Sequence, residues 1–293
     1  MKKEPNKSRS IQSELLRMAE GFAEGTIKSP SKSSYEWNLV GEGGNIEDWE
    51  FTNEAIKSLL REHYNNKGNP FTQVKIDSID QLGDYLKERD YAIVHTRNGH
   101  LFRKGISNHF GFFPEGNRLV THSSNSSRHS VIRNSGILKH SQAEGVFLGA
   151  ALFMEESIIH EFLDIPSEET PILIPSHRRS FEGIQVEIDS MLMWINKGHT
   201  YMALFEVKGT SRKSPDWSGG YSYHQVKNTA MVVAGRLDQN ASYNTTIIPV
   251  YFRNEWSNRS EKWTARLDRF APLDGIDSTP EIMSSLDILH LPR

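Results

Sequence analysis

The chain has 293 residues, 37% of them hydrophobic and 24% charged, with a formal net charge of −3, which is enough for one large core or two smaller ones. It contains no cysteine, which excludes disulfides, thiolate zinc sites and a cysteine nucleophile. No apolar run approaches the ~20 residues that cross a bilayer, and the lysine-rich start lacks an apolar signal-peptide core. We therefore expect a cytoplasmic protein with no membrane partner.

Residues 1–35 begin with a basic run and end in a Lys/Ser/Pro-rich run, and we interpret them as a flexible N-terminal segment. An amphipathic pattern within this segment contains Ile11, Leu15 and Leu16. We expect this apolar stripe to pack on the body of the protein.

Residues 36–143 are expected to form an N-terminal α+β region that helps to hold substrate. Helical spacing predicts helices over 47–64 and over 78–89, the second one opened by a cap at Ser78. Residues 91–103 predict a hairpin, because Asn-Gly at its centre is the preferred two-residue turn.

The stretch 97–142 is strongly basic and carries a loop rich in hydroxyl and amide groups around 121–128. Against a single acid, Glu115, it holds seven cations: Arg97, Arg103, Lys104, Arg118, Arg128, Arg133 and Lys139. Because arginine, asparagine and serine meet phosphates and base edges, we expect this basic stretch to bind nucleic acid. The alternative is a solvated flexible loop. Its histidines lack the i, i+4 spacing of a zinc pair.

A long helix is predicted over 144–163, followed by a short strand over 172–174 that is bracketed by two prolines. Two acids, Glu155 and Glu156, interrupt the apolar side of this helix.

Residues 185–211 alternate with period 2 on either side of the turn Asn196-Lys197-Gly198, and this pattern predicts a β-hairpin. Its otherwise apolar strands carry Glu187, Asp189, Glu206 and Lys208. An acid on a half-buried strand is costly unless it is paired or holds a cation.

Asp189 and Glu206 are expected to face each other across the hairpin, since neighbouring strands lie about 4.8 Å apart. Two carboxylates about 4 Å apart repel by roughly 4 kcal/mol at an effective dielectric of 20, and a divalent cation would relieve that repulsion. Hard oxygen ligands suit Mg²⁺, with Mn²⁺ as a possible substitute. Lys208, one step along the strand, would hold an attacking water or neutralise phosphate charge.

Downstream of the hairpin the sequence predicts a helix over 221–237 that carries Gln225, and then a strand over 246–252. Gln225 would touch substrate, position the lysine or simply pack the helix. Residues 256–293 are expected to form an extension that packs on the core.

The acid on one strand and the acid-X-lysine triplet on the next, Glu206-Val207-Lys208, resemble the PD-(D/E)XK nuclease superfamily. The proline of that name is absent, because Ile188 precedes Asp189. The resemblance covers roughly residues 144–253 and implies an α/β, restriction-endonuclease-like core with a central mixed β-sheet flanked by helices, in the order helix, hairpin, helix, strand.

The resemblance also implies roles for individual residues. The Val207 carbonyl would join Asp189 and Glu206 as a metal ligand, and Glu155 or Glu156 would add a further acid, with Glu156 the favoured one. Glu187 gives an acid-X-acid version of the motif that is similar to resolvase-type and repair-type branches. It would serve the metal or, alternatively, pair with Arg178 or Arg179.

These expectations together describe a magnesium-dependent endonuclease core over residues 144–255 that acts on double-stranded DNA in a type II restriction or phage-defence setting. The chain would work as a homodimer, because palindromic sites mirror two-fold symmetry, or as the nuclease subunit of a larger defence or repair complex. Two alternatives stay open: a non-cleaving nucleic-acid-binding module of the same fold, and a glycosidase-like carboxylate pair that needs neither lysine nor metal.

Overall fold

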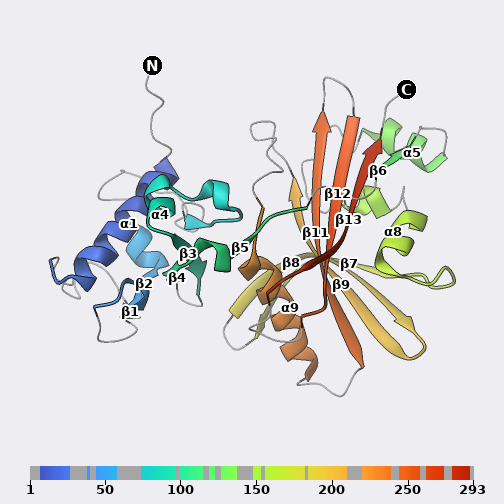
Figure 1. Cartoon of the computed structure of the whole chain (residues 1–293). Helices are drawn as coiled ribbons and strands as arrows, with labels where there is room; N and C mark the ends of the chain where they lie inside the picture. The colour runs from blue at the N-terminus through green and yellow to red at the C-terminus, as the bar shows by residue number, and fades with distance from the viewer. Residues whose placement is uncertain are drawn as a thin grey trace. The chain divides into compact units, whose positions relative to one another are not determined.

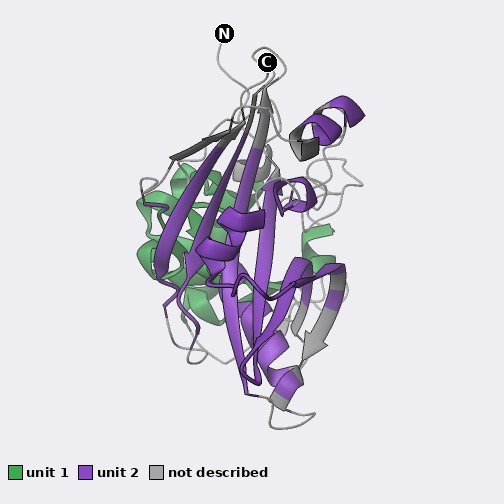
Figure 2. Cartoon of the chain, turned by 90° about the vertical axis from the view of Figure 1, so that its right-hand side faces the viewer, with its two compact units in different colours: residues 1–112, 219–224 green, residues 113–218, 225–293 purple. Residues whose placement is uncertain are grey.

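The fold consists of two compact units. The computed structural model describes residues 7–26, 38–39, 44–57, 74–96, 99–114, 119–122, 127–136, 148–152, 156–181, 184–209, 220–238, 244–257, 262–273 and 279–290. Unit 1 comprises Met1–Phe112 and Gly219–His224, and unit 2 comprises Phe113–Ser218 and Gln225–Arg293 (Figure 2). None of the helices in these ranges combines the length and apolar character that a bilayer crossing requires.

Unit 1 is a small α+β body. A four-stranded antiparallel sheet has the order β1 (Asn38–Leu39), β2 (Trp49–Thr52), β4 (Gly99–Lys104), β3 (Tyr91–His95), and β5 (Phe110–Gly111) pairs separately with β10 (Tyr221–Ser222). The helices include α1 (Lys7–Ala23), α4 (Asp84–Glu88) and three short 3-10 turns, η1 (Ile46–Asp48), η2 (Ile79–Gln81) and η3 (Ile106–Asn108), and residues 53–57 are also helical. Apolar residues of α1, including Leu15 and Leu16, pack with Phe51 and Phe102 in one buried cluster.

The structure of unit 1 confirms two of the predictions for the N-terminal half of the chain and contradicts a third. The apolar stripe of residues 1–35 packs on the body of the protein as expected, because it belongs to helix α1 and is buried in the core of unit 1. The hairpin over 91–103 is confirmed as β3 and β4. The prediction of a helix from residue 47 is wrong at its start, because Trp49–Thr52 form strand β2, which pairs with β1 and β4.

The predicted helix over 78–89 is also wrong, because it is broken into η2 and α4. Leu82 and Gly83 are extended between them, and Ser78 makes no capping hydrogen bond. The cause is tertiary: Gln12 of α1 accepts a hydrogen bond from the Gly83 amide at 2.9 Å and donates one to the Gln81 carbonyl at 3.2 Å.

Unit 2 is built on a seven-stranded mixed sheet in the order β6-β13-β12-β11-β9-β8-β7 (Figure 1). β9 pairs in parallel with β11 and β13 with β6, and the other pairs are antiparallel. The strands are β6 (Leu119–His122), β7 (Ile172–Phe181), β8 (Ile184–Asn196), β9 (His199–Gly209), β11 (Thr245–Ser257), β12 (Lys262–Phe270) and β13 (Ile282–His290). The helices are α5 (Ser127–Ser135), α8 (Glu156–Leu163) and α9 (Tyr223–Asp238), and residues 148–152 are also helical.

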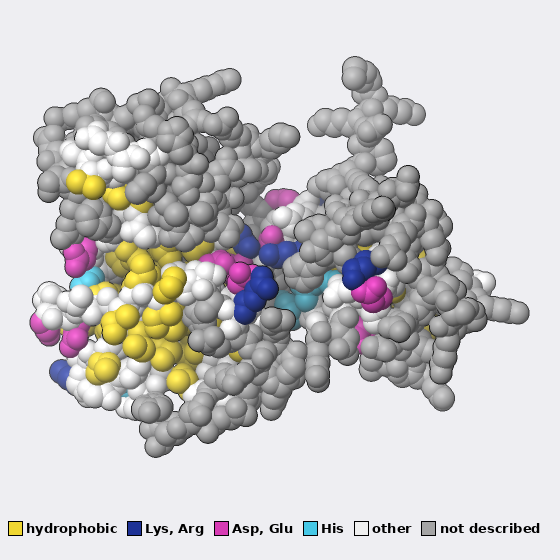
Figure 3. Space-filling view, turned by 180° about the vertical axis from the view of Figure 1, so that it is seen from behind, with side chains coloured by type: hydrophobic (Ala, Val, Ile, Leu, Met, Phe, Trp, Pro, Cys, Tyr) yellow, Lys and Arg dark blue, Asp and Glu magenta, His cyan; other side chains and the backbone are white. Residues whose placement is uncertain are grey.

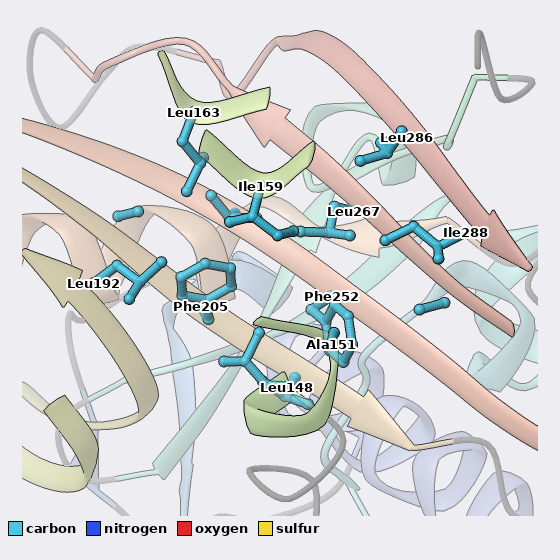
Figure 4. Packing of buried hydrophobic residues seen from close by; sticks show 14 of the residues in the cluster. Leu148, Ala151, Ile159, Leu163, Leu192, Phe205, Phe252, Leu267, Leu286 and Ile288 are labelled. Carbon is cyan, nitrogen blue, oxygen red and sulfur yellow. The ribbon is translucent and has the colours of Figure 1, made fainter. Parts of the chain in front are cut away.

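Helices pack on both faces of this sheet. Ile159 and Leu163 of α8 and Leu148 join Phe205 and Phe252 in the larger cluster on one face (Figure 4). On the other face, Val232 and Val233 of α9 join a smaller cluster that contains residues of β8 and β9. The expected α/β class with a central mixed sheet and flanking helices is thus confirmed. The hydrophobic side chains of unit 2 that remain exposed include Ile172, Leu173 and Ile195. Figure 3 shows a group of exposed hydrophobic side chains on its left-hand side.

The sheet extends beyond its predicted limits at both ends. The strand predicted over 172–174 continues past Pro175 to Phe181, and β7 is the last strand of the described sheet, where a missing N–H is tolerated. Residues 256–293 contribute β12 and β13, which are paired strands of the sheet and not an extension packed against it.

Candidate functional site

The hairpin β8–β9 carries the candidate site at the end away from its turn. Lys197 and Gly198 form a two-residue turn with φ of 50° and 77°, the left-handed backbone that such hairpins favour. Pairing runs from Asn196↔His199 to Ser190↔Phe205 and stops there. The acids and the lysine lie immediately beyond this last pair.

Where the backbones of β8 and β9 stop pairing, the Asp189 side chain takes the place of a backbone acceptor. Its Oδ2 accepts a hydrogen bond from the Val207 backbone N–H at 2.7 Å. Because the N–H and C=O of one strand residue point to the same neighbouring strand, the Val207 carbonyl is also directed toward β8. One carboxylate and one carbonyl are therefore brought together between two strands that are no longer hydrogen-bonded to each other.

Alternation on β8 changes phase at this place. The sequence pattern puts Ile188 and Met191 on opposite faces, but both belong to the buried cluster under α9. The change falls at residues 189–190, next to the end of β8–β9 pairing. Asp189 therefore reaches the edge of β9, which strict alternation does not predict.

Glu206 and Lys208 form an ion pair on the face of β9 that α9 covers further along. Lys208 Nζ lies 2.7 Å from Glu206 Oε1, and the two side chains are 24% and 18% exposed. Both are thus partly shielded yet reachable from solvent.

Gln225, in the first turn of α9, lies close to Glu206. A small cavity is lined by Leu204, Glu206, Gln225, Val226, Thr229 and Tyr251, among others. Tyr251 Oη donates a hydrogen bond of 3.4 Å to Gln225 Oε1. This contact is compatible with either a packing or a substrate role for Gln225.

The donors at this site suit a hard cation. Asp189 and Glu206 provide carboxylate oxygens and Val207 a carbonyl oxygen, from two adjacent strands, and oxygen donors of this kind are those that Mg²⁺ prefers. Within the described ranges, no three His, Asp or Glu side chains gather in a way that could hold a metal ion. Any ion would therefore rely on two carboxylates, the carbonyl and water.

The additional acids lie in different surroundings. Glu187 is exposed and pairs with Arg178 at 3.5 Å, which matches the ion-pair alternative for this residue. Glu156 is the exposed first residue of α8, a helix on the sheet face opposite to Glu206. Glu155 lies outside the described residues.

Within the basic stretch, Arg103 and Lys104 make contacts inside unit 1. Arg103 Nη1 donates to the Glu47 carbonyl at 2.7 Å, and Lys104 Nζ donates to the Arg89 carbonyl at 2.5 Å and lies 4.8 Å from the Tyr91 ring centroid. Arg97, Arg118 and Lys139 lie outside the described residues. Arg128 and Arg133 belong to helix α5, whose start at Ser127 replaces part of the predicted loop; their side chains are not among those described.

Sequence reasoning missed a buried charge cluster on β11 and β12. Asp268 is fully buried, with Arg253 Nη2 at 2.8 Å from its Oδ2 and Arg266 Nε at 3.1 Å from its Oδ1. Ser285 Oγ donates to the same carboxylate at 2.6 Å. The available signal was the alternation of Arg266 and Asp268 with the apolar residues Ala265 and Leu267 in β12.

Comparisons of the chain with protein-family models, with curated proteins and with solved structures found no match.

Proposed function

We propose that this protein is a metal-dependent nuclease that hydrolyses phosphodiester bonds in DNA. The observation that carries the proposal is the hydrogen bond from Val207 N–H to Asp189, located where β8 and β9 stop pairing and next to Glu206 and Lys208. An acid on β8 is therefore in contact with the backbone of the acid-X-lysine triplet on β9.

The order of elements supports a restriction-endonuclease-like core. Helix α8 is followed by β7, the β8–β9 hairpin, helix α9 and strand β11, which lies parallel to β9. This is the order of helix, hairpin, helix and strand that the resemblance implies.

In this proposal Asp189, Glu206 and the Val207 carbonyl would hold Mg²⁺. The ion would neutralise phosphate charge and make a bound water more acidic. Lys208 would orient that water or donate to a phosphate oxygen, since phosphoryl transfer requires mainly charge neutralisation and positioning. A restriction or phage-defence setting, as a homodimer or within a larger complex, belongs to the same proposal.

A non-cleaving nucleic-acid-binding module is the second candidate. The observation that favours it is the ion pair between Lys208 and Glu206, which satisfies both charges without a metal.

Plasmid DNA incubated with the protein in magnesium or in EDTA separates the two candidates. We expect nicking or linearisation with magnesium only, and a loss of orders of magnitude in the Asp189→Asn variant. Glu187→Gln is the matched control, because Glu187 lies two residues away on the same strand and is exposed. DNA binding without cleavage by the wild-type protein would favour the non-cleaving module, and full cleavage by Asp189→Asn would remove Asp189 from the site.

A further inference from the structure

Three cations lie side by side on the sheet of unit 2. The register pairs Lys208 of β9 with Arg253 of β11, and Arg253 with Arg266 of β12. Residues paired in this way point to the same face, and like charges directly opposite each other are destabilising. We call these three residues the cationic row.

The cationic row is supported by an adjacent row of polar residues on the same face. Glu206 is paired with Tyr251, Tyr251 with Asp268, and Asp268 with Ser285. Asp268 contacts both arginines, and the Arg253 guanidinium carbon lies 3.4 Å from the centroid of the Phe113 ring. Asp268 therefore binds the edge of the Arg253 guanidinium, and the Phe113 ring packs on its face.

The opposite face of the same strands is mainly apolar, although it carries the buried Asn254 and also Arg269, which contacts Asp164. Val207, Phe252 and Leu267 are consecutive partners across β9, β11 and β12 and belong to the buried cluster of Figure 4. Buried ion pairs can often be replaced by apolar residues without loss of stability. Packing alone therefore does not explain the concentration of charge on the face that carries Glu206.

On β9 and β11, the change from apolar to polar side chains occurs at neighbouring positions along the two strands. On this face β9 changes from Met202 and Leu204 to Glu206, and β11 changes from Ile247 to Tyr251 and Arg253. Both changes occur toward the carboxyl ends of two parallel strands, where open α/β sheets bind their ligands.

We propose that Arg253 is a second phosphate-contacting residue, which binds a backbone phosphate of the DNA substrate beside Lys208. This inference rests on the proposed nuclease function and names how the site holds its substrate. A guanidinium carries five N–H donors in a fixed fork, so it can hold a carboxylate and a phosphate oxygen together. Asp268 is then a positioning residue that fixes the guanidinium.

The chain provides a matched control for this inference. Arg253→Met and Arg266→Met each remove one nearly buried guanidinium that contacts Asp268, but only Arg253 is paired with Lys208. Arg266 also contacts the Pro114 carbonyl and Asp287, so its loss removes at least as many internal contacts. Both changes are made in the Asp189→Asn variant, which should not cut, and binding of a fluorescent DNA duplex is measured in EDTA at several salt concentrations.

We expect Arg253→Met to weaken binding about tenfold, as for loss of one hydrogen bond to a charged group. The slope of log affinity against log salt should become shallower by about one, because one fewer counterion is released. Arg266→Met should change neither quantity. If either methionine variant unfolds, Arg253→Lys and Arg266→Lys carry the comparison, and only Arg253→Lys should weaken binding because it loses the forked donors.

Equal effects of the two changes, or no effect of either, would overturn the inference. If the wild-type protein still cuts plasmid DNA with magnesium, the proposed nuclease function survives that result. A wild-type protein that neither binds nor cuts DNA would instead overturn the proposed function, and the inference with it.

Discussion

Lys208 has a carboxylate partner inside the chain and, in the proposed site, a phosphate or water partner outside it. The ion pair with Glu206 at 2.7 Å is only partly exposed, which places its energetic role between the small contribution of a surface pair and the larger one of a buried pair. The two roles of Lys208 therefore predict different consequences when the lysine is removed.

Lys208→Ala tests these roles directly. If the lysine only neutralises Glu206, its loss should destabilise the fold by about 2 kcal/mol and leave cleavage intact. If it acts on phosphate or water, melting temperature with magnesium should change little while the cleavage rate falls at least ~100-fold. Arg178→Ala, which breaks an exposed ion pair with Glu187 in the same sheet, should affect neither. An unstable variant that still cuts would contradict the catalytic role.

His95 and His100 predict acid sensitivity of unit 1. Their Nδ1 atoms are 2.7 Å apart, so one neutral ring donates to the other. Burial, and then repulsion by a neighbouring histidine, lower the pKa of His95 to about 3 and that of His100 to about 4. The unfolded chain binds protons below about pH 6.5, so stability is full above that pH and falls toward pH 4, by up to about 1.4 kcal/mol per pH unit for each histidine.

Urea unfolding at pH 7 and pH 5 measures this loss. His100→Gln removes one titrating ring, and the difference in unfolding free energy between the two pH values should then shrink by about half. An equally steep pH dependence in the variant would assign the acid sensitivity to other groups.

At the scale of elements, the sequence predicted best where one local pattern and one local turn decide the structure. The β8–β9 hairpin, helix α9 and strand β11 follow from period and turn chemistry. Prediction failed where a distant partner decides the structure, as at Gly83, whose amide donates a hydrogen bond to Gln12, and at Trp49–Thr52, which pair with β1 and β4. In the site, alternation placed Asp189 and Glu206 on adjacent strands but could not show that pairing ends between them.

The hairpin turn provides an element-scale prediction. Gly198 has φ of 77°, and no atom lies within 4 Å of the place that a methyl group would occupy, so Gly198→Ala costs only backbone strain, about 1 kcal/mol. Lys197→Asn would create the preferred Asn-Gly pair at the two turn positions and should raise stability by a few tenths of a kcal/mol. Thermal unfolding checks both values. Cleavage should be unchanged in both, because the turn is at the far end of the hairpin from Asp189.

At the scale of the whole molecule, the division of the chain is not contiguous. Residues 219–224 follow the β8–β9 hairpin in the sequence but belong to unit 1, because β10 pairs with β5. The sequence predicted one boundary near residue 143 and gave no sign of this return to unit 1. The reason is that β10 is only two residues long, too short to show the alternating pattern of a strand. The basic stretch 97–142 is accordingly divided between the units at Phe112 and Phe113.

The cations of the basic stretch therefore fall into two groups, one in unit 1 and one in unit 2. Arg103 and Lys104 bind carbonyls within unit 1, whereas Arg128 and Arg133 lie on α5 of unit 2. If α5 contacts DNA phosphates, replacing Arg128 and Arg133 by alanine should weaken binding and make the salt slope shallower by about one for each lost contact. Arg103→Ala should instead lower the melting temperature and leave the slope unchanged, because it removes an internal hydrogen bond to Glu47. Titration of a DNA duplex at several salt concentrations, together with melting curves, distinguishes the two. An unchanged slope in the α5 variant with an intact fold would exclude these two arginines from the DNA-binding surface.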